Sequence, residues 1–274
     1  MPLFRILILI GFLTRTAYSQ SSLMFTGMGG KAAGMGYASS CLQDEWSLFH
    51  NTAGLSYLKK SVVATSYDAR PQIQGANRMA LVGAVPTPIG TGAVGVFRFG
   101  DDVYNEQKIA LGFSNRLGLA SLGASINYLQ YQALGFGTKS LFTFNLGGLA
   151  TLTPSFFVGA YIQNVNQPVL SESSEERLST SLSLGVGYSP SEKVWLTGEI
   201  QKQLEVSPTY KIGMEYKPEK KFAARTGMNL YPNKLFLGIG FISTRLTLDY
   251  AYEYSMTGLG SSHQASLAYH LKKK

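Results

Sequence analysis

Apolar and polar residues alternate along most of the chain downstream of residue 60. Between Leu178 and Ser189, leucine, threonine, valine or tyrosine fills every second position, and serine or glycine fills the positions between them. Residues 119–131 and 209–217 repeat this period of two. Successive side chains of a β-strand point to opposite faces, so the pattern predicts strands with one apolar face and one small or polar face.

Fourteen segments carry this alternation, and tight connections alternate with longer ones between them. The predicted strands are residues 61–69, 77–85, 90–99, 106–115, 118–131, 139–152, 155–164, 178–188, 193–203, 208–217, 221–231, 234–241, 244–254 and 262–271. Short turns on one side and longer loops on the other are typical of an outer-membrane barrel. An even number of strands also brings both ends of the barrel to the same side.

The composition favours a membrane barrel over a soluble domain. Only 15% of the 274 residues are charged, whereas a soluble domain carries about 25%. After the N-terminus no apolar run is long enough for a membrane helix. We therefore predict an all-β fold, a closed antiparallel transmembrane β-barrel of about 14 strands with its small and polar faces toward the lumen. The net charge of +8 forms no basic and aromatic stripe, so we expect outer-membrane lipids as partners and no nucleic acid.

The first residues have the features of a secretory signal peptide. Arg5 precedes an apolar core at residues 6–13, and Ala17-Tyr18-Ser19 provides small residues at the cleavage site. We expect cleavage before Gln20. The predicted organisation is a signal peptide at 1–19, an N-terminal hatch or plug at 20–60, the transmembrane barrel at 61–271 and a basic C-terminal tail at 272–274.

The stretch Gly27–Leu55 differs from the rest of the chain. It begins with a glycine-rich run, continues through a polar patch with Trp46, and ends in the turn sequence His50-Asn51-Thr52-Ala53-Gly54. Residues 39–49 can form one or two helical turns, with Leu42, Trp46 and Phe49 on one face. A compact segment before a long run of strands has its natural place inside the barrel.

This stretch resembles the N-terminal hatch of the FadL-like outer-membrane barrel superfamily. The shared pattern is G-x-x-A-A-G-M-G-x-A, then D-[DE]-W-S, then N-x-A-G-L, and it is most similar to the PorV/PorQ branch associated with type IX secretion. Thr52 stands where that family usually has proline, which removes a restraint on φ. The hatch-motif residues of this chain are Gly30, Gly34, Met35, Gly36, Asp44, Glu45, Trp46, Asn51, Gly54 and Leu55.

The resemblance implies a plugged barrel in the outer membrane of a Gram-negative bacterium, with both termini on the periplasmic side. It also implies an accessory or partner role in type IX secretion, with secretion-system proteins or secreted cargo as partners. The alternative is a FadL-like channel for passive uptake of hydrophobic small molecules. Fatty-acid transporters of the superfamily have long apolar outer loops, whereas the longest loop predicted here, 165–177, is short and acidic. This difference favours secretion.

Charged residues occur on the predicted lumen faces of the later strands. They are Glu199, Lys211, Glu215, Arg225, Arg245, Asp249 and Glu253. Both signs lie on neighbouring strands, so we expect ion pairs that fill the lumen; the alternative is a polar permeation path. We also expect Asp44 or Glu45 to pair with cationic side chains of the wall, namely Lys211, Arg225 or Arg245.

The sequence contains little that could support catalysis. The histidines are His50, His263 and His270, Cys41 is the single cysteine, and no nucleophile-elbow or zinc-protease motif occurs. One cysteine can form no internal disulfide. We therefore expect no enzyme activity, and neither a metal nor another cofactor.

Overall fold

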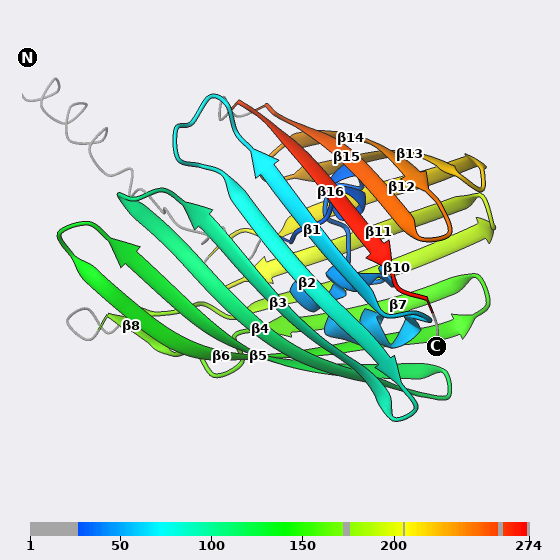
Figure 1. Cartoon of the computed structure of the whole chain (residues 1–274), viewed down its shortest axis with the longest axis horizontal. Coiled ribbons are helices and arrows are strands. Elements are labelled where there is room, and N and C mark those ends of the chain that lie inside the picture. Colours follow the sequence, from blue (N-terminus) through cyan, green and yellow to red (C-terminus); the bar gives the residue numbers. More distant parts are fainter. Residues whose placement is uncertain (1–26, 172–175, 205, 257–259, 273–274) are drawn as a thin grey trace, which may run out of the picture.

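The strands close into a single barrel. The computed structural model describes residues 27–171, 176–204, 206–256 and 260–272. Fourteen strands form an antiparallel barrel in which β1 pairs with both β2 and β16 (Figure 1). The predicted closed 14-stranded barrel is thus confirmed, while the predicted signal peptide at 1–19 lies outside the described residues.

The strand boundaries follow the alternation in the sequence to within a few residues. The strands are β1 (Val62–Ala69), β2 (Arg78–Thr87), β3 (Gly90–Gly100), β4 (Tyr104–Leu117), β5 (Ala120–Ala133), β6 (Gly137–Thr153), β7 (Phe156–Gln163), β8 (Val169–Ser171), β9 (Glu176–Arg177), β10 (Ser181–Ser191), β11 (Val194–Gln203), β12 (Thr209–Glu219), β13 (Phe222–Leu230), β14 (Lys234–Ile242), β15 (Leu246–Ser255) and β16 (Ser261–His270). The short strands β8 and β9 form a separate two-stranded sheet within the connection from β7 to β10, which we predicted as a loop.

The two ends of the barrel differ in their connections. We call one the short-turn end; it holds the start of β1, the end of β16 and the tight connections 88–89, 118–119, 154–155, 192–193, 220–221 and 243–245. We call the other the long-loop end; it includes the long connection between β7 and β10. This is the alternation of loop lengths that the sequence predicted.

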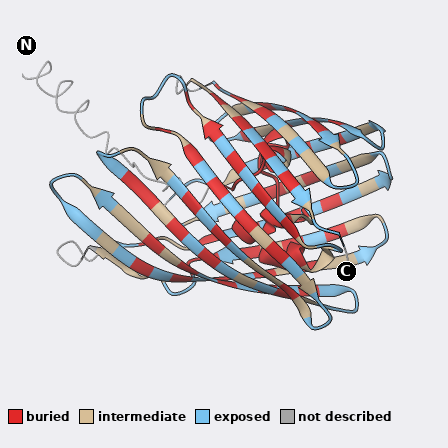
Figure 2. Ribbon diagram, in the orientation of Figure 1, coloured by how far each residue is buried: buried red, intermediate tan, exposed pale blue. Residues whose placement is uncertain are grey.

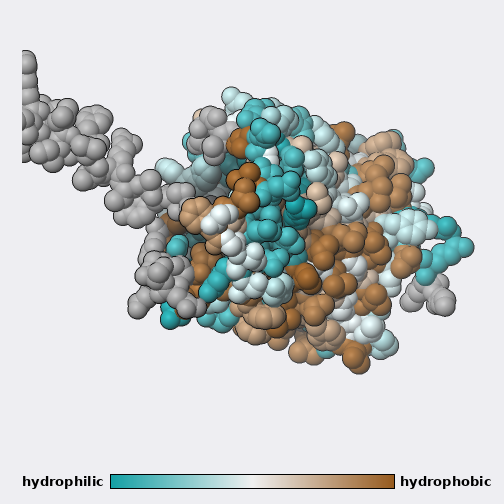
Figure 3. Space-filling model, turned by 60° about the vertical axis from the view of Figure 1, so that its left-hand side comes forward, coloured by the Kyte–Doolittle hydropathy of each residue, from teal (hydrophilic) through white to brown (hydrophobic). Residues whose placement is uncertain are grey.

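Each strand has one buried face and one exposed face, so burial forms stripes along the wall (Figure 2). In β10 the buried positions are serine and glycine, and the exposed positions include Leu182, Leu184 and Val186. Exposed hydrophobic side chains occur on the strands all round the barrel, and on the face in Figure 3 they gather beside a hydrophilic band. The barrel therefore has an apolar exterior and a small or polar interior, as in barrels that span membranes.

The N-terminal segment, which we define as residues 27–58, forms three short helices. They are α2 (Gly30–Gly34), η2 (Glu45–Phe49) and η3 (Thr52–Tyr57). Asp44 caps η2 with a capping box, and the Asn51 side chain accepts a hydrogen bond from the backbone of Ala53 at the start of η3. The predicted helical turns at 39–49 are therefore limited to the 3₁₀ helix η2. The Asn51 cap begins η3 although position 52 is threonine and not proline.

Helix α2 contacts β13–β16, whereas η2 and η3 contact the opposite wall, chiefly β2–β6. In Figure 1 the blue helices lie between the front and back strands. The segment is almost wholly buried, and Met28, Met35, Leu42 and Leu55 are among its most buried side chains. It packs against the inner face of both sides of the barrel.

None of the helices in the described ranges has the length and apolar character needed to cross a membrane.

Candidate functional site

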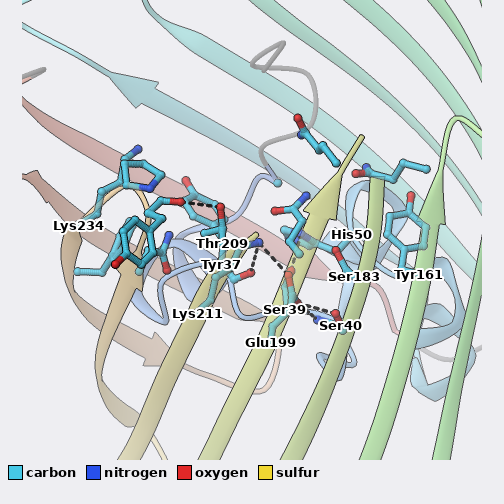
Figure 4. Close-up of a pocket in the computed structure, with 18 of the residues that line it drawn as sticks. Tyr37, Ser39, Ser40, His50, Tyr161, Ser183, Glu199, Thr209, Lys211 and Lys234 are labelled. Carbon is cyan, nitrogen blue, oxygen red and sulfur yellow. Dashed lines mark hydrogen bonds and ion pairs between the residues drawn. The ribbon is translucent and has the colours of Figure 1, made fainter. Parts of the chain in front are cut away.

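Several buried hydrogen bonds join the N-terminal segment to the wall. Glu199 on β11 is at the centre of this contact (Figure 4). One carboxylate oxygen accepts hydrogen bonds from the backbone nitrogens of Ser39 at 2.9 Å and Ser40 at 2.8 Å, and from the Ser40 hydroxyl at 2.5 Å. The other oxygen pairs with Lys211 Nζ at 2.8 Å, and this ammonium also donates to the carbonyl of Tyr37 at 3.3 Å. One buried ion pair thus holds the turn at residues 37–40.

This arrangement reverses the polarity that the sequence predicted. We expected carboxylates of the segment to meet cations of the wall, but the wall supplies the carboxylate and the segment supplies backbone N–H groups. The charged partner of Asp44 is Lys31, 3.7 Å away in the same segment. Lys211 and Arg225 instead pair with carboxylates of other strands of the wall. The predicted pairing of Asp44 or Glu45 with the wall is therefore wrong.

Two titratable groups of the segment are shifted by burial. Burial raises the pKa of the Glu45 carboxyl to about 8, and the nearby Asp44 carboxylate adds to the rise. Burial lowers the pKa of His50, which favours the neutral ring. The Met28 carbonyl, 2.8 Å from Nε2, can only accept, so Nε2 carries the proton and Nδ1 accepts from the Ser39 hydroxyl at 3.0 Å. His50 thereby joins the beginning of the segment to its centre without a charge.

Glu45 makes the position of the segment sensitive to pH. When the segment is released and Glu45 is exposed, the carboxyl has its ordinary pKa of 4.5. When the segment is in place and Glu45 is buried, the pKa is about 8. The stabilisation of the buried segment by this group is complete below pH 4.5 and is lost as the pH rises through 8, because ionisation favours the exposed state. We expect amide-exchange protection of residues 27–58, corrected for intrinsic rates, to fall at least about tenfold between pH 6 and pH 8.

The variant Glu45→Gln should remove this dependence, since the amide stays neutral. Its protection at pH 8 should exceed that of the wild type. The exposed Glu219 provides a matched control, and Glu219→Gln should retain the wild-type profile. A wild-type profile that is flat from pH 6 to pH 8 would contradict the raised pKa.

Six of the seven predicted lumen charges meet in buried ion pairs. Arg225 on β13 binds Glu215 on β12 at 2.7 Å and Asp249 on β15 at 2.7 Å. Glu253 on β15 binds Lys234 on β14 at 2.7 Å. It also binds Arg70, which follows β1, at 3.2 Å. Opposite charges on the inner face therefore neutralise one another, both between adjacent strands and across an intervening strand, and they do not form a ring of one sign.

Arg245 is the exception among the predicted lumen charges. We placed it on the inner face of a strand at 244–254, but β15 begins at Leu246 and Arg245 is exposed in the preceding turn. The turn is closed by the Ser243 backbone nitrogen, which donates to the Leu246 carbonyl at 2.7 Å. This bond turns the chain before the strand begins, so the Arg245 side chain points to solvent.

The predicted lumen charges did not include Arg70 and Lys234, the partners of Glu253, or the buried pair of Arg78 and Asp68. The side chains of Arg78 and Asp68 are fully buried on β2 and β1 and share a short charge-assisted hydrogen bond. Arg78 also donates to the Tyr37 hydroxyl at 3.1 Å, and Tyr37 in turn donates to Gln264 at 3.2 Å. Both charges lie within strands that were predicted correctly. Alternation of apolar and polar residues could have shown which face of these strands points inward. Because β1 and β2 have apolar residues on both faces, the alternation did not show that Asp68 and Arg78 lie on the inner face.

The turn residue Asn51 joins three parts of the molecule. Its amide nitrogen donates to the Ser40 carbonyl at 2.7 Å and to the Gly148 carbonyl on β6 at 2.8 Å, while its oxygen caps η3. Nearby, Ser114 on β4 donates to the Ala53 carbonyl at 3.0 Å. The carbonyls and N–H groups of this non-regular segment thus find partners on the wall.

Glycines let the segment and wall backbones approach closely. A Cβ atom at Gly227 would overlap the backbone of Met35 and Gly36, and one at Gly213 would overlap the Met35 carbonyl. The remaining hatch-motif residues also face this contact or the inside of the segment. Gly30 donates to Ser266 on β16, Gly34 lies against Gly238, Trp46 stacks on Phe49, Gly54 lies against the Leu42 carbonyl, and Leu55 is fully buried.

Two cavities lie on either side of the segment. One of about 320 Å³ is lined by Tyr37, Ser39 and His50 of the segment and by loop residues such as Val206 and Pro232 of the long-loop end. The other, of about 190 Å³, is lined by Lys31, Leu42 and Gln43 and by residues of the short-turn end such as Lys193. Among the described residues no cluster of histidine, cysteine and carboxylates is arranged to hold a metal ion.

Comparison with known proteins identifies both a family and a fold. The family model described as type IX secretion system membrane protein PorP/SprF matches residues 97–269. A comparison with curated protein sequences found no match. The PorV/PorQ-like motif at 30–55 lies outside the matched range.

Solved structures of FadL-like barrels share the fold. The toluene transporter TbuX of Ralstonia pickettii is 12% identical with a TM-score of 0.68, over 90% of this chain and 99% of that one. The toluene transporter TodX of Pseudomonas putida is 12% identical with a TM-score of 0.69, over 89% and 97%. A FadL homologue from Pseudomonas aeruginosa is 11% identical with a TM-score of 0.63, over 90% and 99%.

Proposed function

Because the chain belongs to the PorP/SprF family of type IX secretion system membrane proteins, we propose that it serves protein secretion as an accessory or partner component in the outer membrane. The family match carries this proposal, since it covers most of the barrel wall. The expected partners are secretion-system proteins or secreted cargo, with outer-membrane lipids around the apolar exterior.

The N-terminal segment acts in this proposal as a plug that closes the lumen. Its position between two separate cavities supports this role. So do the hydrogen bonds of the Glu199 carboxylate and the wall glycines that receive the segment backbone. A segment held by buried polar contacts at both walls blocks free diffusion through the barrel.

The finer role combines two lines of support. The motif between Gly30 and Leu55 resembles the hatch of the PorV/PorQ branch, whereas the family match is to PorP/SprF. Both families are associated with type IX secretion, so they support the same process. We place the short-turn end, which holds the start of β1 and the end of β16, in the periplasm, because outer-membrane barrels have their short turns there.

Binding, and not catalysis, is the activity we propose. The buried carboxylates Glu199, Glu215 and Glu253 are each held in an ion pair, as Glu199 is with Lys211. His50 is neutral and uses both ring nitrogens in structural hydrogen bonds. Such groups hold a structure in place, and they are poorly placed to transfer protons to a substrate.

Deletion of the gene in a bacterium with type IX secretion tests the proposal. We expect type IX cargo to accumulate in the periplasm, and we expect affinity-tagged chain to co-purify with secretion-system proteins from native membranes. A tagged outer-membrane porin of similar abundance is the control for non-specific capture. Normal cargo export after deletion would reject the secretion role.

The alternative function is passive uptake of hydrophobic small molecules. The fold shared with toluene transporters favours it. The cavity at the long-loop end opposes it, because charged and amide side chains such as Arg70, Glu253 and Gln201 line it. We expect toluene uptake by cells to be the same with and without the chain; faster uptake with the chain would favour the channel.

A further inference from the structure

The short-turn end has an excess of exposed cationic side chains. They lie on its tight connections or beside the start of β1: Lys59, Lys60, Lys193, Lys220, Lys221 and Arg245. The exposed carboxylates there are Glu192, on one of these connections, and Glu219, the last residue of β12. A surface on which cations outnumber anions in this way attracts anionic partners and accelerates their encounter.

The smaller of the two cavities lies directly behind this basic rim. It has a volume of about 190 Å³ and is lined by Lys31 and Gln43 of the N-terminal segment and by Trp195 and Lys217 of the wall. Lys193 belongs to both the rim and the cavity lining. The cavity is therefore within reach of a chain that docks on the rim.

Two buried donors at this cavity have no hydrogen-bond partner in the described part of the chain. They are the side-chain nitrogen Nε2 of Gln43 and the indole nitrogen Nε1 of Trp195. A buried donor without a partner carries a free-energy cost, because it has lost its hydrogen bonds to water and gained none in the protein. A ligand that offers acceptor oxygens here would remove that cost, and both residues line the same cavity.

The charges around the cavity suit a ligand with a single negative charge. Lys31, Lys193 and Lys217 line it together with Glu192 and Glu215. The Lys31 and Lys217 side chains remain 26% and 36% exposed although each has a carboxylate partner, so their ammonium groups can donate further hydrogen bonds. A carboxylate has two acceptor oxygens and one charge, which match these donors better than a phosphate dianion does.

We propose that the short-turn end binds an acidic peptide segment, one carboxylate of which enters the cavity beside Gln43 and Trp195. The placement of this end in the periplasm rests on the proposed secretion role, so the partner is an acidic segment of a periplasmic or translocating protein. The binding itself depends only on the residues described. The proposed site specifies the chemistry of a partner, which the family match does not identify.

A lipid headgroup fits this site less well. Headgroups surround the outside of a barrel, whereas Trp195 lies on the inner face of β11, in phase with the buried Thr197 and Glu199. The N-terminal segment forms the other side of the cavity through Lys31, Leu42 and Gln43. A peptide that approaches along the barrel axis can reach this space, and an annular lipid cannot.

Fluorescence anisotropy with the full-length protein in detergent tests the proposal. The probe is a fluorescein-labelled peptide of alternating glutamate and glycine, compared with its glutamine counterpart at about 50 mM salt, where screening is weak. We expect the glutamate peptide to bind at least about tenfold more tightly. Trp195→Phe and Gln43→Met together should weaken its binding about tenfold without lowering the thermal stability, because they remove unpartnered donors and no hydrogen bonds.

Lys202 provides a matched control, because it is an exposed lysine at the other end of the same strand as Trp195. Lys202→Gln should leave the affinity unchanged. Equal binding of the two peptides, or full affinity in the Trp195→Phe/Gln43→Met variant, would overturn the proposal. So would binding of phosphatidylglycerol micelles in the absence of peptide binding, which would assign the rim to lipid.

This assay requires no secretion partner. If the glutamate peptide does not bind but the protein co-purifies with secretion-system proteins, the acidic-peptide site is rejected and the secretion role stands. If the peptide binds but deletion of the gene does not impair cargo export, the secretion role alone is rejected.

Discussion

We expect the variant Glu199→Ala to release the N-terminal segment while leaving the strands intact. The Glu199 carboxylate accepts three hydrogen bonds from Ser39 and Ser40 and pairs with Lys211. Removing one partner of a buried ion pair costs about 3–5 kcal/mol, because the remaining charge is left unpaired. The barrel keeps its closed backbone hydrogen-bond ladder, so the loss falls on the contact with the segment.

The single cysteine provides the measurement. Cys41 is fully buried beside the Gly185 carbonyl, and burial raises the pKa of its thiol to about 12, so it should resist maleimide while the segment is in place. In Glu199→Ala the labelling rate should rise at least about 100-fold, which corresponds to the loss of about 3 kcal/mol. In planar bilayers the wild type should show little steady conductance and the variant intermittent openings.

The variant Asp44→Ala tests whether Asp44, as the sequence predicted, or Glu199, as in the structure, holds the segment on the wall. The charged partner of Asp44 is Lys31, which belongs to the same segment and moves with it. We therefore expect labelling in Asp44→Ala to rise much less than in Glu199→Ala. Equal rates in Glu199→Ala and the wild type would mean that packing, and not this carboxylate, holds the segment.

Gly227→Val should have a comparable effect through shape alone. The new side chain would occupy the space of the Met35 and Gly36 backbone, which cannot move by a rotamer change. Overpacking typically costs about 1–3 kcal/mol and more where backbone must shift. We expect Cys41 labelling at least about tenfold faster than in the wild type, with the heat-modifiable migration of the folded barrel retained.

Gly83 is the matched control for this substitution, because it is a strand glycine beside which a Cβ atom would find open space. Gly83→Val should leave Cys41 protected. Protection in Gly227→Val equal to that in Gly83→Val would show that the segment does not occupy the space in front of β13.

The strand pattern could be predicted from the sequence because its cause is local. A strand exposes alternate residues to lipid and lumen, so Leu182, Leu184 and Val186 had to alternate with small residues. The glycine-rich motif likewise marked the N-terminal segment, because only glycine permits backbones to approach as Gly227 and Gly36 do. Six lumen charges followed from the same alternation.

The alternation and the glycine-rich motif therefore indicated the barrel, the direction of its faces and a compact N-terminal segment. The partners of the charged side chains follow only from the folded molecule. A sequence states the sign of each charge but not its distance to the others, so the predicted contact with the wall was assigned to Asp44 or Glu45, and Glu199 was placed only among the ion pairs of the lumen. Only the closure of the barrel brings Glu199 to the backbone of Ser39 and Ser40, and joins Asp68 to Arg78. Only the turn closed by Ser243 places Arg245 outside the lumen.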